Sequence, residues 1–330
     1  MTTKSTAAVK TSAGNKPKSN KKNAPKSNNK ASKTALTEKE NSSILTEQSS
    51  HMEETSSQSG PQISIPDTEL NNGTGESSDS VKSNDEKPTI VIPYIEKFAK
   101  GQELLYALRA WAENFPGCKI VIIGDFPDFA SEEVLHIPHI AEFKSPQLDV
   151  AAKLIQAIAS DLVPDDFILS NDDIYPVNFI EPSDIADLKC AGILGNTKKS
   201  ANPKYLEKIL RTRNLLSARK LPIYDYSTHT PFLFNKTRLA KVIARYKADQ
   251  EPLLISSLYF NTCFKDEVPV IIKGGATSDF VGYVYRKDPD LDVLEDAFMS
   301  RKFINHNSEG YEAVLPFLQQ HFPEKSRFEI

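Results

Sequence analysis

The chain has 330 residues, of which 25% are charged, and its formal net charge of −4 at pH 7 excludes a uniformly basic nucleic-acid-binding class. Its three cysteines are widely spaced, which excludes a disulfide framework and a cysteine-based zinc site. No apolar run approaches the roughly 20 residues that cross a bilayer, and no signal peptide is recognisable. We therefore expect a cytoplasmic protein without a membrane span.

Residues 1–87 contain no Phe, Tyr, Trp or Cys, and this composition predicts a disordered tail. The tail divides by charge, with nine Lys and no acid in residues 1–36, and eleven acids against three Lys in residues 37–87. The basic arm predicts binding to nucleic acid or to an acidic partner, with a merely solvated tail as the alternative. Every aromatic residue falls in residues 88–330, which we expect to form one catalytic domain.

The first folded segments predict a strand–helix–strand unit. Residues 89–94 are β-branched and apolar, residues 101–115 carry apolar side chains at helical spacing, and residues 119–125 form a second apolar run. Such a unit places its two strands side by side and parallel.

The pattern continues with a helix over residues 149–162 and a strand over 167–169. Beyond that strand the chain becomes more helical. Alternating strands and helices predict an α/β fold with an open, mostly parallel sheet flanked by helices. The later predicted elements are helices at 203–219, 235–247, 252–264 and 310–322, and a strand at 268–272.

Asn171, Asp172 and Asp173 directly follow the apolar run 167–169. In an α/β protein, side chains at the carboxyl end of a buried strand face the crevice where ligands bind. Carboxylates there can hold a hard divalent cation against a phosphate. The alternative is an ordinary turn, in which Asn and Asp are common for backbone reasons.

A second candidate is His229, which precedes Pro231 and lies among small hydroxyl residues. Histidine can act as an acid or base, or as a cation against phosphate, near neutral pH. A basic run lies upstream, between Lys204 and Lys220. Arginine suits bidentate phosphate binding, although a solvated helix face is the simpler interpretation. The arginines of this run are Arg211, Arg213 and Arg219.

Four segments, in the same order, resemble the Stealth family of sugar-1-phosphate transferases. Residues 103–110 (ELLYALRA) resemble its E-L-x-Y-S-L-R-S helix, and residues 167–175 (FILSNDDIY) its F-I-Y-x-N-D-D segment. Residues 229–231 (HTP) resemble its H-x-P motif, and residues 322–329 (FPEKSRFE) its F-P-x-x-S-x-F-E ending.

The resemblance implies a GT-A-like fold that transfers a hexose-1-phosphate from a nucleoside diphosphate sugar to a hydroxyl of a glycan or polysaccharide acceptor. It implies that Asp172 and Asp173 hold Mg²⁺ or Mn²⁺. His229, together with an arginine among Arg211, Arg213 and Arg219, would hold the transferring phosphoryl group. Asn171 would contact the substrate. Arg109 would either contribute to the substrate pocket or brace its helix.

The chain departs from the family pattern at three places. Residues 90–94 lack the acid and the Trp of the family's first strand, and residues 304–308 lack the acids of its last motif. The arginine expected downstream of His229 in the family's third region has no convincing counterpart. Two alternatives therefore stay open. One is a GT-A glycosyltransferase that moves the sugar without its phosphate. The other is a non-catalytic binding protein, for example of a virion, that acts through the basic arm.

Overall fold

The computed structural model of the chain describes residues 87–141, 145–196, 203–272 and 279–330. The predicted tail, apart from Lys87, lies outside the described residues. Within them, no helix is both long and apolar enough to span a bilayer.

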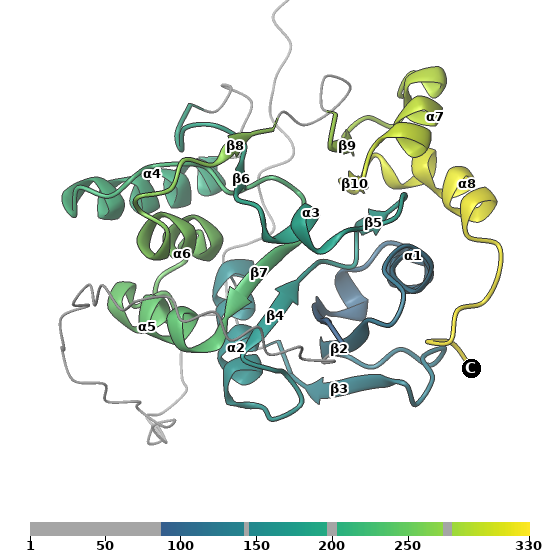
Figure 1. Ribbon diagram of the computed structural model, residues 1–330, viewed down its shortest axis with the longest axis horizontal. Coiled ribbons are helices and arrows are strands. Elements are labelled where there is room, and N and C mark those ends of the chain that lie inside the picture. The colour runs from purple at the N-terminus through teal and green to yellow at the C-terminus, as the bar shows by residue number, and fades with distance from the viewer. Residues whose placement is uncertain (1–86, 142–144, 197–202, 273–278) are drawn as a thin grey trace, which may run out of the picture. The chain divides into compact units, whose positions relative to one another are not determined.

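The centre of the fold is a five-stranded sheet in the order β3-β2-β1-β4-β7 (Figure 1). Four strands are parallel and β7 is antiparallel to β4, which confirms the predicted open, mostly parallel α/β sheet. Sequence analysis missed β3 and β7, because β3 is an edge strand broken by a proline and β7 has only four residues. The strands are β1 (Thr89–Tyr94), β2 (Lys119–Gly124), β3 (Val134–Pro138), β4 (Asp166–Leu169) and β7 (Phe232–Asn235).

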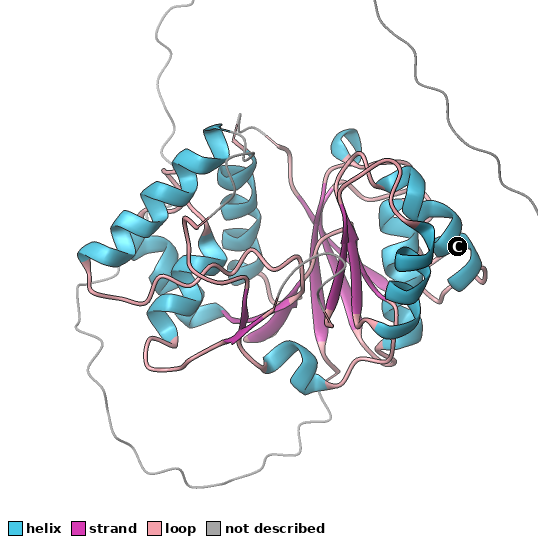
Figure 2. Ribbon diagram, turned by 90° about the horizontal axis from the view of Figure 1, so that it is seen from above, coloured by secondary structure: helices cyan, strands magenta, loops and turns pink. Residues whose placement is uncertain are grey.

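Alternation along the strands sends their side chains into two separate cores, with helices on both sides of the strands (Figure 2). Ile90 and Ile92 pack with α1 (Glu103–Asn114), whereas Val91 packs on the opposite side with α2 (Pro146–Ala159). The period of two in the strands and the apolar stripes of the helices therefore match, as the sequence predicts.

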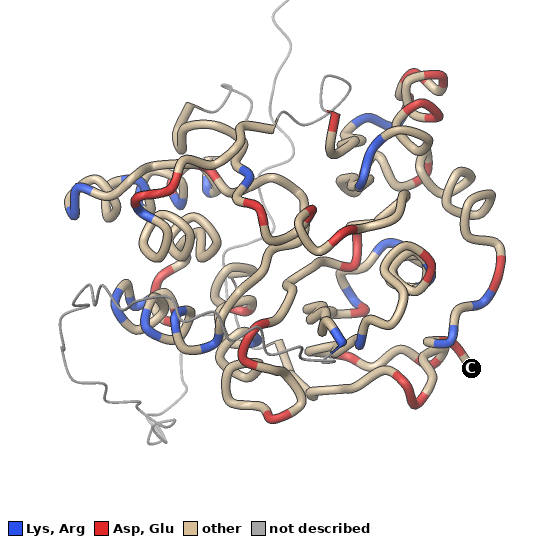
Figure 3. Tube along the Cα trace, viewed as in Figure 1, with Lys and Arg blue, Asp and Glu red and all other residues tan. Residues whose placement is uncertain are grey.

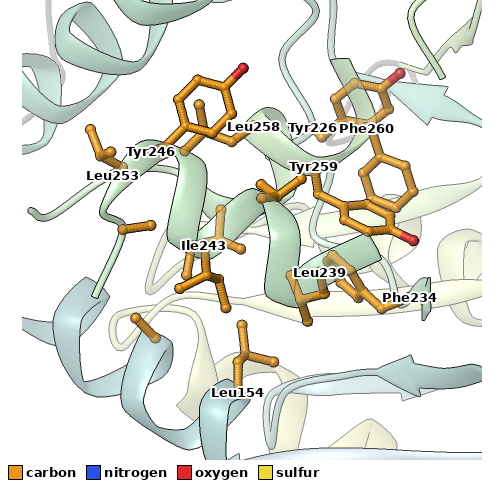
Figure 4. Packing of buried hydrophobic residues seen from close by; sticks show 14 of the residues in the cluster. Leu154, Tyr226, Phe234, Leu239, Ile243, Tyr246, Leu253, Leu258, Tyr259 and Phe260 are labelled. Atoms are coloured by element: carbon orange, nitrogen blue, oxygen red, sulfur yellow. The ribbon is translucent and has the colours of Figure 1, made fainter. Parts of the chain in front are cut away.

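Three further helices pack beside α2 around an aromatic-rich cluster (Figure 4). Phe234 of β7 contacts Tyr259 and Phe260, with ring centroids 4.6 and 5.4 Å apart. Each of these helices confirms a predicted one, with ends that differ by a few residues. They are α4 (Pro203–Ala218), α5 (Lys236–Tyr246) and α6 (Ile255–Cys263).

A second, three-stranded sheet in the order β5-β10-β9 lies against α1 and was not predicted. Its strands are short and distant in sequence, so no local repeat reveals them. Its strands are β5 (Ile174–Pro176), β9 (Val281–Val284) and β10 (Phe303–His306). The helices of the same region are α7 (Leu291–Ser300) and α8 (Tyr311–His321). The remaining elements are a 3₁₀ turn (Glu96–Phe98), α3 (Pro182–Ala186), β6 (Lys189–Cys190) and β8 (Val270–Ile271).

The strand order creates a switch point between β1 and β4. From β1 the chain runs through α1 to β2 on one side, whereas from β3 it runs through α2 to β4 on the other. Connections that diverge in this way leave a crevice outside the carboxyl ends of the two strands, where α/β proteins bind ligands.

Candidate active site

The predicted carboxylates follow β4 at this switch point. Asp172 and Asp173 lie in the short connection from β4 to β5, so this loop joins the two sheets. Burial raises the pKa of Asp172 to about 6. Burial and the neighbouring charge of Asp172 raise the pKa of Asp173 to about 7. Hydrogen bonds from Asn305 and Asn171 lower the pKa of Asp173 only in part, and the charge of Lys153 does the same for Asp172, so the protein environment compensates these charges incompletely.

The strongest sign of a missing partner is a pair of buried oxygen atoms. Oδ1 of Asp173 and Oδ1 of Asn305 are both buried and accept no hydrogen bond from the described residues. Asn305 lies on β10, is fully buried, and donates from Nδ2 to the backbone oxygen of Asp173 over 2.8 Å. Buried acceptors without donors are rare in proteins, and each one calls for an explanation such as an ion.

Glu103 adds a third carboxylate that sequence analysis did not assign to the site. It begins α1, is 6% exposed, and accepts a hydrogen bond from the backbone N–H of Lys100. Burial, together with the charges of Asp172 and Asp173, raises its pKa to about 7. Its position at the start of the ELLYALRA helix was the one feature of the sequence that could have indicated a role for Glu103 in the site.

Behind Glu103 lies a buried hydrogen-bonded pair. The ring of His306 has its Nε2 atom 2.9 Å from the hydroxyl of Tyr175 and 3.8 Å from Oε1 of Glu103. Because its Nδ1 atom lies 3.0 Å from the backbone oxygen of Asn307, Nδ1 carries the proton and Tyr175 donates to Nε2. Burial lowers the pKa of His306, which favours this neutral form. Asn305 and His306 belong to the segment in which the family acids are missing.

His229 is held in an unusual backbone conformation. Its φ is +55°, in the left-handed region. Lys220 and Lys247 share this region among the described residues, but they follow the ends of α4 and α5, where such angles are common. His229 ends no helix, and strained residues of this kind cluster at functional sites.

The imidazole of His229 stacks on Tyr283 of β9, with ring centroids 4.3 Å apart. His229 is exposed to solvent, yet desolvation by the surrounding protein lowers the pKa of its imidazole. Burial and the charge of Asp173 raise the pKa of Tyr283. Tyr283 therefore contacts the predicted histidine and is close enough to Asp173 to respond to its charge, so the fold brings His229 and Asp173 into one region.

A cleft of about 290 Å³ opens beside this region. We call it the hydroxyl-lined cleft. Asn171 and His229 both line it, so the structure places these two predicted residues together. Its other walls come from the first turns of α2, α4 and α6, represented by Gln147, Tyr205 and Ser256, and from residues 226–230 and 253–257.

Arg109 does not reach the cleft. Its guanidinium contacts Glu329 at 2.8 Å and donates to the backbone oxygen of Phe322 at 3.0 Å. The hydrogen bond with Glu329 raises the pKa of Arg109. These contacts tie α1 to the C-terminal segment and match the bracing role, which was one of the two predicted roles.

The three predicted phosphate-binding arginines also do not line the cleft. Basic residues are frequent along α4 and α5 (Figure 3), but Arg211 pairs with Glu207 and Glu251 at 3.0 and 3.2 Å. Arg219 lies over the ring of Tyr246, 4.9 Å from its centroid, and Arg213 packs against Gly195. Because α4 packs on the core through Ile209 and Leu216, its arginines lie on other faces of the helix.

The carboxylate region suits a divalent cation that a substrate helps to bind. Among the described residues, no three His, Cys, Asp or Glu side chains are arranged to hold a metal by themselves. Mg²⁺ commonly takes only one or two protein carboxylates and completes its shell with substrate phosphates and water. The unpartnered oxygen of Asp173 and the raised pKa values of both aspartates fit that mode.

Comparison with known proteins gives fold-level likeness only. No family model and no curated protein sequence matches the chain. It is similar to a galactosyltransferase, LgtC, solved with donor and acceptor sugar analogs, with 11% identity, a TM-score of 0.42, and coverage of 72% of this chain and 96% of that one. A glycosyltransferase involved in glycosylating the major capsid of PBCV-1 shows 12% identity, a TM-score of 0.38, and coverage of 72% and 100%. The apo-form glycosyltransferase GlyE of Streptococcus pneumoniae TIGR4 shows 11% identity, a TM-score of 0.29, and coverage of 56% and 45%.

Proposed function

We propose that the chain is a GT-A-like transferase that takes a hexose-1-phosphate from a nucleoside diphosphate sugar and places it on a hydroxyl of a glycan acceptor. The unpartnered oxygen of Asp173 beside Asp172, at the switch point of the sheet, carries this proposal. The resemblance of four ordered segments to the Stealth family supports the kind of group that is transferred.

Asp172 and Asp173 would hold Mg²⁺ or Mn²⁺, and that ion would neutralise charge on the donor diphosphate. Asn305 fixes the loop that carries the aspartates by donating to the backbone oxygen of Asp173. Glu103, which accepts from the backbone N–H of Lys100, adds a third carboxylate whose pKa responds to their charges. The protein thereby presents acceptor atoms at one place before the donor arrives, which lowers the reorganisation needed on binding.

His229 would act on the acceptor. Burial lowers its pKa, so its ring is neutral near pH 7 and able to accept a proton. The acceptor hydroxyl oxygen would bond to the phosphorus next to the sugar, and its proton would pass to His229. The bridging P–O bond would break and release a nucleoside monophosphate.

A second reaction on the same site is transfer of the sugar without its phosphate. This reaction needs no basic side chain to hold a transferring phosphoryl group, and Arg211 and Arg219 are engaged by Glu207, Glu251 and the ring of Tyr246. In that reaction the acceptor oxygen bonds to the anomeric carbon, and a nucleoside diphosphate leaves.

The released nucleotide distinguishes the two reactions. The full chain is incubated with a panel of nucleoside diphosphate sugars, mixed glycan acceptors and Mn²⁺, and products are identified by mass. A monophosphate supports hexose-1-phosphate transfer, and a diphosphate assigns plain glycosyl transfer. If the donors bind and no product forms with any acceptor, a catalytic function is contradicted, and the non-catalytic alternative replaces it.

A further inference from the structure

The hydroxyl-lined cleft has a chemical character of its own. None of its described lining residues is Asp, Glu, Lys or Arg. Its polar side chains are neutral amides and hydroxyls, with His229 at the end next to Asn171. A ligand here would meet both donors and acceptors of hydrogen bonds, but no carboxylate in the lining itself. The charge of Asp225, which is outside the lining, acts on the pKa of Tyr205 and of His229.

Hydroxyl groups contribute to the lining of this cleft. The hydroxyl of Tyr205 on α4 is hydrogen-bonded to Oγ of Ser227 over 3.1 Å, which links the helix to the loop. Hydroxyls both donate and accept, as the hydroxyls of a sugar do. Ser256, in the first turn of α6, adds another hydroxyl to the lining.

Two helices also turn their amino ends toward the cleft. α2 begins with Pro146 and α6 with Ile255, and no side chain caps the first turn of either helix. Backbone N–H groups in an uncapped first turn need acceptors, and the helix dipole makes such an end unfavourable for a cation.

The remaining wall is apolar. Leu154, Leu169 and Leu253 line the cleft together with the rings of Tyr226 and Phe232. Aromatic and aliphatic walls with a few placed polar groups are typical of small-ligand sites. A sugar ring has this dual character, because its C–H groups form an apolar face and its hydroxyls lie around the edge.

We propose that the hydroxyl-lined cleft is the acceptor subsite, and that it takes a sugar ring that bears no positive charge. The assignment to the acceptor rests on the proposed function. The cation and the donor diphosphate need the carboxylates Asp172 and Asp173, neither of which lines the cleft, whereas Asn171 and His229 join the cleft to that region. A volume of about 290 Å³ suits one compact ring at the small end of ligand sites.

The test measures sugar binding apart from turnover. Saturation-transfer NMR of the full chain, without metal or donor, is recorded with the methyl glycosides of glucose, galactose, mannose and N-acetylglucosamine. Methyl glucosaminide, which carries an ammonium group, is the charged counterpart. We expect at least one neutral glycoside to bind, and glucosaminide to bind at least about tenfold more weakly, because two helix amino ends border the cleft and none of its lining side chains is an acid.

Two variants locate the binding. Ser256→Trp fills the cleft from the second position of α6, and Thr237→Trp makes the same change at the second position of α5, outside the described lining. We expect the first to abolish glycoside binding and the second to retain it, with thermal unfolding confirming that both fold. Tyr205→Phe, which removes a hydroxyl and keeps the ring, should weaken binding about 2- to 10-fold.

Parallel titration with Mn²⁺ and nucleoside diphosphate sugars separates the two proposals. Donor binding without binding of any neutral glycoside overturns the acceptor subsite and leaves the proposed function standing. Glycoside binding that Ser256→Trp removes, without donor binding, supports a sugar site and contradicts the proposed function. Binding that survives Ser256→Trp, or glucosaminide binding as tight as that of the neutral sugars, overturns the inference.

Discussion

Two groups of buried ionisable side chains lie near the carboxyl edge of the same sheet and differ in how their charges are compensated. In the paired group, Asp149 of α2 contacts Lys153 at 2.7 Å and His139 at 2.8 Å. In the unpaired group, Glu103, Asp172 and Asp173 lie close enough to affect each other's pKa. The paired group completes its own interactions, whereas the unpaired group requires something from outside.

The pKa shifts of the two groups run in opposite directions. Burial alone would raise the pKa of Asp149, but hydrogen bonds from Lys153 and His139 outweigh it and lower the pKa. For Asp172, burial dominates, and the distant charge of Lys153 offsets only part of the shift. Burial of a carboxylate therefore does not by itself indicate function. The absence of a compensating partner distinguishes the candidate site from a structural ion pair.

Breaking the paired group should have the largest effect on stability. Asp149→Ala leaves the Lys153 ammonium buried, with 4% of its side chain exposed and no counter-ion, and we expect a loss of about 3–5 kcal/mol in the free energy of unfolding. Urea denaturation checks this value. The double variant Asp149→Leu with Lys153→Met should recover most of the loss. If it unfolds as easily as the single variant, ion pairing is not what Asp149 contributes.

Changing the unpaired group should instead remove turnover. Asp172→Asn keeps the size of the side chain and removes its charge, so we expect nucleotide release to fall about 10²- to 10³-fold, as when a charge-stabilising group is lost. Steady-state release by the full chain with Mn²⁺ measures this. The matched variant Arg211→Ala, at an exposed ion pair away from the cleft, should keep wild-type turnover.

The ion pair between Arg109 and Glu329 should matter for stability and not for catalysis. Only 13% and 3% of the two side chains are exposed, so we expect Arg109→Ala to lower the free energy of unfolding by about 2–3 kcal/mol and leave KM for the donor unchanged. Arg211→Ala should change stability by less than about 1 kcal/mol. A raised KM in Arg109→Ala with unchanged stability would restore the predicted substrate-binding role of Arg109.

The smallest expected effect is on the pH dependence of stability, which distinguishes the unpaired group from the paired group most directly. The folded pKa of Asp173, about 7, exceeds its usual value of 3.8, so the folded state binds more protons between these values. Stability therefore falls as pH rises from about 4 to about 7. At pH 8 in metal-free buffer, the free energy of unfolding of Asp173→Asn should exceed that of wild type by about 1–2 kcal/mol, and this difference should shrink as the pH falls and vanish below about pH 4.

For Asp149 the direction is reversed. Because the pKa of Asp149 is lowered in the folded state, its contribution to the free energy of unfolding is present at neutral pH. That contribution is lost as the pH falls through the folded-state pKa. Parallel denaturation curves of wild type and Asp173→Asn at pH 5 and pH 8 test the contrast. A variant that is less stable than wild type at pH 8 would show that Asp173 is compensated after all.

The sequence predicted the part of the site that is local. Asp172 and Asp173 follow an apolar run, and this pattern predicts a buried strand with carboxylates at its carboxyl end, where ligands bind in α/β proteins. Glu103, Asn305 and His306 reach the same region only through packing between segments separated by up to about 200 residues, for which no local pattern exists. The phosphate-binding role of Arg211, Arg213 and Arg219 stays a prediction, although none of them lines the cleft, because basic composition does not say which face a helix buries. The spacing of Ile209, Thr212 and Leu216, all buried, carried that information.

Binding of Mn²⁺ tests most directly that the unpaired group is the donor and cation site. Electron paramagnetic resonance of free Mn²⁺ is recorded with the full chain and a nucleoside diphosphate, for wild type, Asp172→Asn, Asp173→Asn and Arg211→Ala. The account predicts that wild type and Arg211→Ala bind Mn²⁺ together with the nucleotide, and that each aspartate variant loses most of this binding. Undiminished Mn²⁺ binding in both aspartate variants would contradict it.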